Sequence, residues 1–148
     1  MKIAIGSDHA AIPLKDVILG HIKSRGFAVT DLGAKGESGA DYPKYAKIIS
    51  DEIVKGEYDL GVLLCGTGAG MCISANKVRG IRAVVCSDTY TARLSREHNN
   101  AQVLCLGARV LGAELAKEIT DAFLNAKFLG ERHQTRVDMI MAIEGSSI

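Results

Sequence analysis

The residues best suited to do chemistry lie in one short glycine-rich segment, Cys65-Gly66-Thr67-Gly68-Ala69-Gly70. Glycines between a strand and a helix let the backbone bend sharply and aim several N–H groups at one point. Such N–H groups, with a helix N-terminus behind them, attract an anion and favour a reactive thiolate. Cys65 is therefore a candidate for a reactive group. The alternative is a phosphate or nucleotide loop with an inert cysteine beside it.

A dinucleotide-binding fingerprint is the obvious competing interpretation of this segment. The pattern G-x-G-x-x-G would require glycine at Met71, and the loop follows the third predicted strand instead of the first. Asp88 lies about 20 residues further on, where a ribose-binding acid would sit. Many strands of α/β proteins end in an acidic residue, however, so the sequence argues against a nucleotide cofactor here.

Three other segments carry candidate groups, and each has a plainer interpretation. Asp8 and His9 follow the first predicted strand, but Asp8 could cap the first helix and His9 could simply be solvated. The segment Ser95–Asn100 (SREHNN) is typical of a polar helix end. Arg132 and Arg136 share one helix face, as two guanidinium groups that bind a phosphate would, or as a solvated face would.

The elements that must position these groups alternate between strands and helices. Apolar runs rich in valine and isoleucine predict strands at Lys2–Gly6, Phe27–Leu32, Leu60–Cys65, Arg82–Cys86 and Val103–Leu106. Apolar residues at three-and-four spacing predict helices at Ile12–Ile22, Lys44–Val54 and Leu111–Ala126, and a last helix covers about Arg132–Glu144. The fold class is therefore α/β: a three-layer α/β/α, Rossmann-like domain over residues 1–148, with a five-stranded parallel sheet and an extra C-terminal helix.

The composition of the chain argues against several classes of protein. The chain has 148 residues, 47% of them hydrophobic, and a formal net charge of +1. The balanced charge argues against a nucleic-acid partner, and the absence of a long apolar run argues against a signal peptide or membrane span. The four cysteines show no C-x-x-C or zinc-ligand spacing, so we expect no metal, a cytoplasmic location, and buried thiols at Cys72, Cys86 and Cys105.

The topology sorts the candidates into two groups. In such sheets ligands bind at the carboxyl ends of the strands, where the strand order reverses. Residues that follow a strand reach this edge: Ser7, Asp8, His9, Tyr42, Cys65 to Gly70, Asp88 and Arg109. If the order runs 2-1-3, Asp8, His9 and Cys65 face one crevice. His98 and Asn99 end a helix, and so fall at the opposite edge.

Taken together, the motifs closely resemble the type B ribose-5-phosphate isomerase family, which includes allose-6-phosphate isomerase and the galactose-6-phosphate isomerase subunits. The resemblance covers essentially the whole chain. It rests on the collinear strings GSDHA, DYP, CGTGAG, SANK, GIRAVVCSD, SREHNN, LGARVLG and GERHQTRV.

The resemblance implies an aldose–ketose isomerase that interconverts D-ribose 5-phosphate and D-ribulose 5-phosphate through an enediolate, without metal or organic cofactor. Cys65 is then the base, and His98 is the acid that opens the sugar ring. Thr67 assists at the sugar oxygens. The other implied roles are the enediolate-binding backbone of Gly66, Gly68, Ala69 and Gly70, the sugar contacts of Asp8, His9 and Asn99, and the phosphate contacts of Arg109, Arg132 and Arg136. Tyr42, in the DYP string, is a further substrate-binding candidate.

Some points stay open at this stage. Some relatives use a glutamate base slightly further along, but this chain has no acid at Ala69–Cys72, and Pro13 was not expected near the first helix. A six-carbon phosphosugar (allose or galactose 6-phosphate) is the alternative substrate, and a nucleotide-binding module is the alternative outside the class. His98 and Cys65 lie at opposite edges, roughly 13–20 Å apart. A homodimer that shares its active sites resolves this conflict, and family members form dimers or larger assemblies, so a tetramer is also open.

Overall fold

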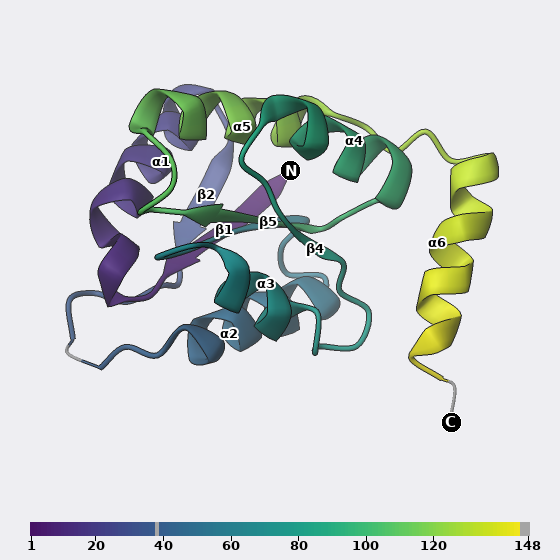
Figure 1. Cartoon of the computed structure of the whole chain (residues 1–148), viewed down its shortest axis with the longest axis horizontal. Coiled ribbons are helices and arrows are strands. Elements are labelled where there is room, and N and C mark those ends of the chain that lie inside the picture. Colours follow the sequence, from purple (N-terminus) through teal and green to yellow (C-terminus); the bar gives the residue numbers. More distant parts are fainter. Residues whose placement is uncertain (38, 146–148) are drawn as a thin grey trace.

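Five parallel strands form the sheet at the centre of the molecule (Figure 1). They are β1 (Lys2–Ser7), β2 (Ala28–Asp31), β3 (Leu60–Cys65), β4 (Ala83–Val85) and β5 (Val103–Gly107), in the order β2-β1-β3-β5-β4. The structure is a computed structural model that describes residues 1–37 and 39–145. Every residue of β3 and β5 is buried, as expected for strands covered on both faces. The predicted 2-1-3 neighbourhood is confirmed, and the order reverses between β1 and β3.

Helices cover both faces of this sheet and complete the predicted three layers (Figure 1). On one face lie α1 (Ile12–Ser24), α4 (Thr89–Asn99) and α5 (Ala113–Asn125), and on the other lie α2 (Tyr42–Val54) and α3 (Ala69–Ala75). The two apolar cores therefore sit on opposite sides of the sheet. Ile5 and Phe123 belong to the first core, and Ile49 and Leu63 belong to the second.

The first helix begins at Ile12 as predicted, but a short 3₁₀ helix precedes it. Asp8 caps a short 3₁₀ helix, η1 (His9–Ala11), by accepting the N–H of Ala10 at 3.0 Å. Pro13 then sits in the first turn of α1, where its missing N–H costs nothing. The unexpected proline therefore fits the helix start, and it leaves the residues at the end of β1 in place.

The final helix, α6 (Arg132–Ile143), stands beside the three layers and packs chiefly against α4 (Figure 1). Its N-terminal half is held by the buried side chains of His133 and Val137. Its C-terminal end is held by Glu144, whose carboxylate accepts the N–H of Gly80 at 2.9 and 3.1 Å. The helix is therefore fixed at both ends, although much of its surface faces away from the body.

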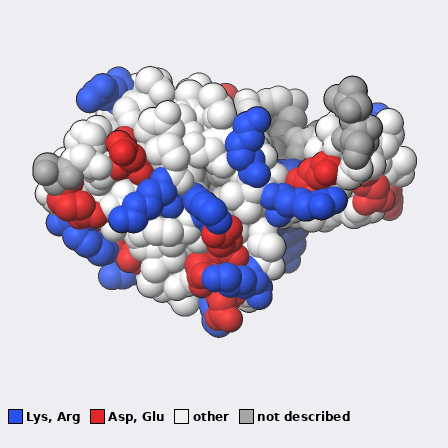
Figure 2. All heavy atoms as spheres, turned by 90° about the horizontal axis from the view of Figure 1, so that it is seen from below, with Lys and Arg blue, Asp and Glu red and all other residues white. Residues whose placement is uncertain are grey.

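The charged residues are spread over the surface. Figure 2 views the molecule from the side of α2 and α3, and basic and acidic groups lie interspersed on this face. Among residues 1–37 and 39–145, no helix is long and apolar enough to cross a membrane.

Candidate active site

A pocket of about 410 Å³ opens at the carboxyl edge of the sheet, beside the point where the strand order reverses. It is lined by Asp8, His9, Ala10, Tyr42, Cys65, Gly66, Thr67, Gly70 and Arg109. Eight of these nine positions were placed at this edge by the sequence, from segments up to a hundred residues apart. The prediction that Asp8, His9 and Cys65 face one crevice is confirmed.

The thiol of Cys65 sits at the bottom of this pocket, at the last residue of β3. It is 4% exposed, and its sulfur accepts the N–H of Gly68 at 3.2 Å. The loop is tied to the end of β5 because the N–H of Ala108 bonds to the carbonyl of Cys65 and that of Arg109 to the carbonyl of Gly66, both at 2.9 Å. The sulfur and the N–H of Gly68 therefore face one another in the wall of the pocket.

Glycine is required at two positions for this loop to close on its neighbours. Gly68 has a φ of +79°, and a side chain there would lie 2.9 Å from Val85 Cγ2 and 3.0 Å from the backbone of Leu106. A side chain at Gly107 would lie 2.8 Å from the backbone of Thr67. The loop thus rests directly on the ends of β4 and β5, and these contacts fix where its N–H groups point.

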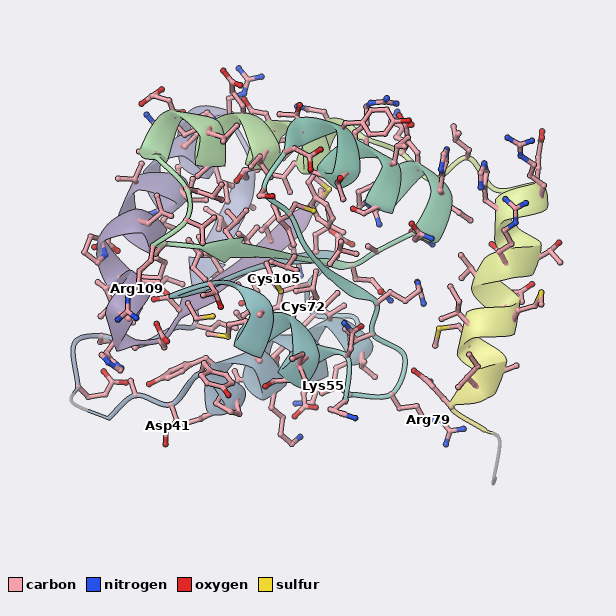
Figure 3. All side chains as sticks on the ribbon, viewed as in Figure 1. Asp41, Lys55, Cys72, Arg79, Cys105 and Arg109 are labelled. Atoms are coloured by element: carbon pink, nitrogen blue, oxygen red, sulfur yellow. The ribbon has the colours of Figure 1, made fainter. Side chains whose placement is uncertain are left out.

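The opposite wall of the pocket comes from η1 and the start of α2. His9 lies with its Nδ1 3.5 Å from the carbonyl of Ala40, and its ring is exposed. The ring of Tyr42 lies over Gly70, where an added Cβ would meet ring carbons at 2.8 Å. Arg109 closes the third side over Gly66, and Figure 3 shows it at the end of the molecule where α1 begins. The pocket therefore offers an imidazole, a phenol, a carboxylate and a guanidinium around the thiol.

The loop between β2 and α2 is anchored by a buried lysine that the sequence analysis did not single out. Lys15 is 2% exposed, and its Nζ donates to Asp31 Oδ2 at 2.8 Å and to the carbonyl of Ala34 at 3.0 Å. Burial raises the pKa of Asp31, but hydrogen bonds from Lys15 and Lys35 outweigh this and lower it overall. On the same loop, Tyr45 donates to Glu37 and lowers the pKa of that carboxyl to about 2. This network holds the segment that leads to Tyr42 and that contacts His9 through the carbonyl of Ala40.

The remaining candidate residues form a second group, at the corner where α4 meets α6. The rings of His98 and His133 stack with centroids 4.2 Å apart and planes inclined by 7°. Burial, and then the positive charges of His98, Arg132 and Arg136, lower the pKa of His133. Arg132, Arg136 and Asn99 are exposed at this corner. We call the set His98, Asn99, Arg132, His133 and Arg136 the α4–α6 corner.

The pocket and the α4–α6 corner lie at opposite edges of the sheet. Cys65 pairs with Gly107 at the carboxyl end of β5, whereas α4 ends just before the amino end of this strand at Val103. Four steps along a strand span about 13 Å. The residues lining the pocket include none of the corner. The predicted separation of His98 from Cys65 is therefore confirmed within one chain.

The structure also shows the surroundings of Asp88 and of the three cysteines outside the pocket. Asp88 caps α4 by accepting the N–H of Thr91 at 2.7 Å, which accounts for an acid at this position. Cys86 and Cys105 are buried as predicted, but the prediction for Cys72 was wrong. This thiol is only partly buried because α3 has just two turns and lies at the edge strand β4. Among the described residues, no three His, Cys, Asp or Glu side chains are grouped to hold a metal ion.

Residues 3–140 match the model of the Ribose/Galactose Isomerase family. The chain is 52% identical to ribose-5-phosphate isomerase B of Escherichia coli (strain K12), over 97% of this chain and 96% of the relative. The chain belongs to the ribose/galactose isomerase family. This membership agrees with the resemblance inferred from the motifs.

Two further relatives of this chain carry the name of a sugar phosphate isomerase. D-erythrulose-4-phosphate isomerase of Pectobacterium atrosepticum (strain SCRI 1043) is 50% identical over 95% of this chain and 93% of its own. The crystal structure of ribose-5-phosphate isomerase B from Mycoplasma genitalium with bound ribulose-5-phosphate matches with a TM-score of 0.93. It is 42% identical and covers 99% of this chain and 97% of that one.

His133 is the corner residue that the sequence analysis overlooked. In the string GERHQTRV, only Arg132 and Arg136 were named as candidate site residues. A usable signal was present, because His133 and Val137 are four residues apart and so share a helix face. A histidine beside an apolar residue on one face indicates a packed imidazole, which the stack on His98 then explains.

Proposed function

We propose that this chain is an aldose–ketose isomerase that interconverts D-ribose 5-phosphate and D-ribulose 5-phosphate through an enediolate. The observation that carries the proposal is the Cys65 sulfur, held by the N–H of Gly68 at the bottom of an open polar pocket. Membership of the ribose/galactose isomerase family, and the bound ribulose-5-phosphate in a relative's structure, support the sugar phosphate as substrate.

The proton transfer is assigned to Cys65. As the thiolate it takes the proton from C2 of the open-chain aldose and returns it to C1, while the hydroxyl proton moves between the two oxygens. Removing a proton next to a carbonyl requires both a base and a place for the developing oxyanion. The N–H groups of Gly66 to Gly70 supply that place, and Thr67, which is exposed at the pocket rim, contacts the sugar oxygens.

The rest of the pocket orients the sugar. Asp8 has one carboxylate oxygen engaged by the N–H of Ala10, which leaves the other for a sugar hydroxyl. His9 and Tyr42 line the same wall, and Arg109 is placed to meet the anionic end of the substrate. Because the phosphate is remote from the reacting carbons, its binding energy can hold the substrate in the reactive position.

The α4–α6 corner completes the site from a second copy of the chain. His98 opens the furanose ring by donating a proton to the ring oxygen, and Asn99 holds the sugar. Because His98 stacks on His133 within one chain, the end of α4 and the start of α6 lie side by side. Arg132 and Arg136 therefore enter the same site as His98, and they bind the phosphate together with Arg109.

The assembly is accordingly a homodimer with shared active sites, and a tetramer of two such dimers is the larger alternative. Exposed apolar residues on α6 support a contact with another copy: Met139 is 67%, Ile140 is 41% and Ile143 is 71% exposed. The four free thiols also support the cytoplasm as the location of the protein.

An isomerase assay on the purified protein tests the reaction. We expect turnover of ribose 5-phosphate to exceed that of allose 6-phosphate and galactose 6-phosphate. Erythrulose 4-phosphate belongs in the same panel, because a relative of nearly equal identity carries that activity in its name. Titration with NAD is the control for a nucleotide-binding module. Saturable NAD binding without turnover of any sugar phosphate contradicts the proposal.

A further inference from the structure

Outside the pocket, two thiols meet where α3 packs on β5. Cys72 lies on α3 and is partly buried, whereas Cys105 lies in the middle of β5 and is fully buried. Figure 3 shows the two side chains side by side, and Cys72 packs against the apolar cluster to which Cys105 belongs. The Cys72 sulfur also lies 3.4 Å from the carbonyl of Ala83 and 3.6 Å from Nδ2 of Asn76.

The two thiols differ in pKa because their surroundings differ. The hydrogen bond with Cys105 comes first among the causes that lower the pKa of Cys72 to about 7, and the backbone of Val85 and the Asn76 amide act in the same direction against burial. Complete burial raises the pKa of Cys105 well above its usual range. The more accessible sulfur is thus the one that ionises. A reactive thiolate beside a second thiol is the arrangement found in cysteines that are oxidised reversibly.

We propose that Cys72 and Cys105 form a reversible disulfide when the protein meets hydrogen peroxide. The Cys72 thiolate attacks one peroxide oxygen, the O–O bond breaks, and the released hydroxide takes up a proton, which leaves a sulfenic acid on Cys72. The Cys105 thiol then attacks this sulfur and water leaves. The two thiols supply two electrons and the peroxide is reduced to two waters. A dithiol reverses the reaction by thiol–disulfide exchange.

The disulfide acts on the glycine loop because both cysteines are close to it. The two neighbouring sulfurs must approach to a covalent bond length of about 2.05 Å, so α3 has to move towards β5. α3 begins at Ala69, directly after the loop, and Gly107 lies two residues beyond Cys105. The loop has little room for this shift, because even one added Cβ at Gly68 or Gly107 would lie no more than 3.0 Å from the backbone of Leu106 or Thr67. Oxidation therefore disturbs the N–H groups around Cys65, a consequence that rests on the proposed function, whereas the disulfide itself does not.

The chemistry of the pair can be tested without any isomerase assay. In the Cys65→Ala, Cys86→Ala double variant only Cys72 and Cys105 remain as thiols. Hydrogen peroxide should remove two hydrogen atoms from the intact mass, and a non-reducing digest should contain a Cys72–Cys105 cross-linked peptide. Adding Cys72→Ser should abolish both changes. Adding Cys105→Ala should instead leave a sulfenic acid on Cys72 that dimedone labels. The absence of the cross-linked peptide in the folded double variant overturns the proposal.

The link to activity is tested separately in chains that keep Cys65. Wild-type activity should fall in step with formation of the cross-linked peptide and should return with dithiothreitol. The Cys72→Ser variant should retain its activity at the peroxide concentration that inactivates wild type. Equal loss in both chains overturns the link between the disulfide and the loop. A chain that forms the disulfide but isomerises no sugar phosphate before oxidation refutes the proposed function and leaves the thiol pair standing.

Discussion

The pocket and the α4–α6 corner are built in contrasting ways. The pocket is made from strand ends and a glycine loop, with a nearly buried thiol and walls tied to one another by backbone hydrogen bonds. The corner is made from side chains on two helices, with one stacked histidine pair and two exposed arginines. We propose that the pocket supplies the base and the N–H donors, whereas the corner supplies the acid and most of the positive charge.

This contrast teaches that, within one chain, the proposed base and the proposed acid lie at places where they cannot meet. A phosphosugar in the pocket would find Cys65 but only Arg109 for its phosphate. A phosphate at the corner would lie at the opposite edge of the sheet from the Cys65 thiol. Two-fold symmetry is the simplest arrangement that brings each half against the other, because one contact then builds two complete sites. The predictions below separate the two halves, from the largest expected effect to the smallest.

Loss of the base should have the largest effect. Cys65→Ala should lower kcat by about 10²–10⁴-fold, the usual contribution of a positioned acid or base. Binding of the sugar phosphate should stay close to wild type, because the phosphate contacts lie elsewhere. Steady-state kinetics and a binding titration measure both quantities. Cys72→Ala, assayed under reducing conditions, is the matched control and should keep its activity. A Cys65→Ala enzyme within a few fold of wild type would refute the assignment.

The next effect concerns the stability of the pocket half. Lys15→Met removes the cation from a buried pair, and breaking such pairs costs roughly 3–5 kcal/mol of unfolding free energy. The lower end applies here, because Lys35 still contacts Asp31 at 2.6 Å. Urea unfolding measures the change. Lys47→Met is the control: its ion pair with Asp51 is exposed, and such pairs contribute at most about 1 kcal/mol. Equal effects of the two substitutions would show that Lys15 does not anchor the loop.

The corner should dominate phosphate binding. Arg132→Ala or Arg136→Ala should weaken binding of both the sugar phosphate and inorganic phosphate by about ten- to a hundredfold. The basis is that hydrogen bonds to charged groups contribute roughly 1.5–3 kcal/mol each. Calorimetric titration measures both ligands. Arg25→Ala, on α1 and paired with Asp121, is the control and should bind normally. Unchanged affinity for both ligands would remove the arginines from the site.

The smallest effect is a pH dependence confined to the corner. The pKa of His133 is lowered in the folded chain, so the unfolded chain binds more protons as the pH falls below about 6.5. Protonation of His133 therefore destabilises the fold on the acid side of this value and has no effect well above it. Urea unfolding of wild type and His133→Asn at neutral and mildly acidic pH measures the difference. The stability advantage of wild type should shrink at acidic pH, and an advantage that grows would contradict the sign.

Much of the pocket could be predicted from the sequence, because parallel topology alone decides which residues reach the carboxyl edge. Asp8 and Arg109 follow strands and Cys65 ends one, and all three line the pocket. The predicted strand boundaries were less accurate where a side chain, instead of a neighbouring strand, bonds to the backbone. Arg82 was assigned to a strand, but its N–H bonds to Oε1 of Gln102 at 2.8 Å and the strand begins at Ala83.

The features that escaped prediction are pairings between side chains distant in sequence. The stack of His98 on His133 depends on the placement of α6, which the contact of Glu144 with Gly80 fixes at its other end. Periodicity identifies a helix and its buried face, but it does not say which neighbour that face meets. The same limit applies to the pairing of Cys72 with Cys105 across α3 and β5.

Mixing two inactive chains tests the shared site most directly. A Cys65→Ala chain is combined with a His98→Ala chain under conditions that allow subunit exchange. Random pairing makes about half of the dimers mixed, and each mixed dimer has one doubly defective site and one intact site. The control mixes Cys65→Ala with Arg109→Ala, two changes in the same half, and should restore nothing. The account predicts that the first mixture recovers about a quarter of wild-type activity. If His98 served its own chain, every site would carry a defect, and a mixture as inactive as its two components would contradict the account.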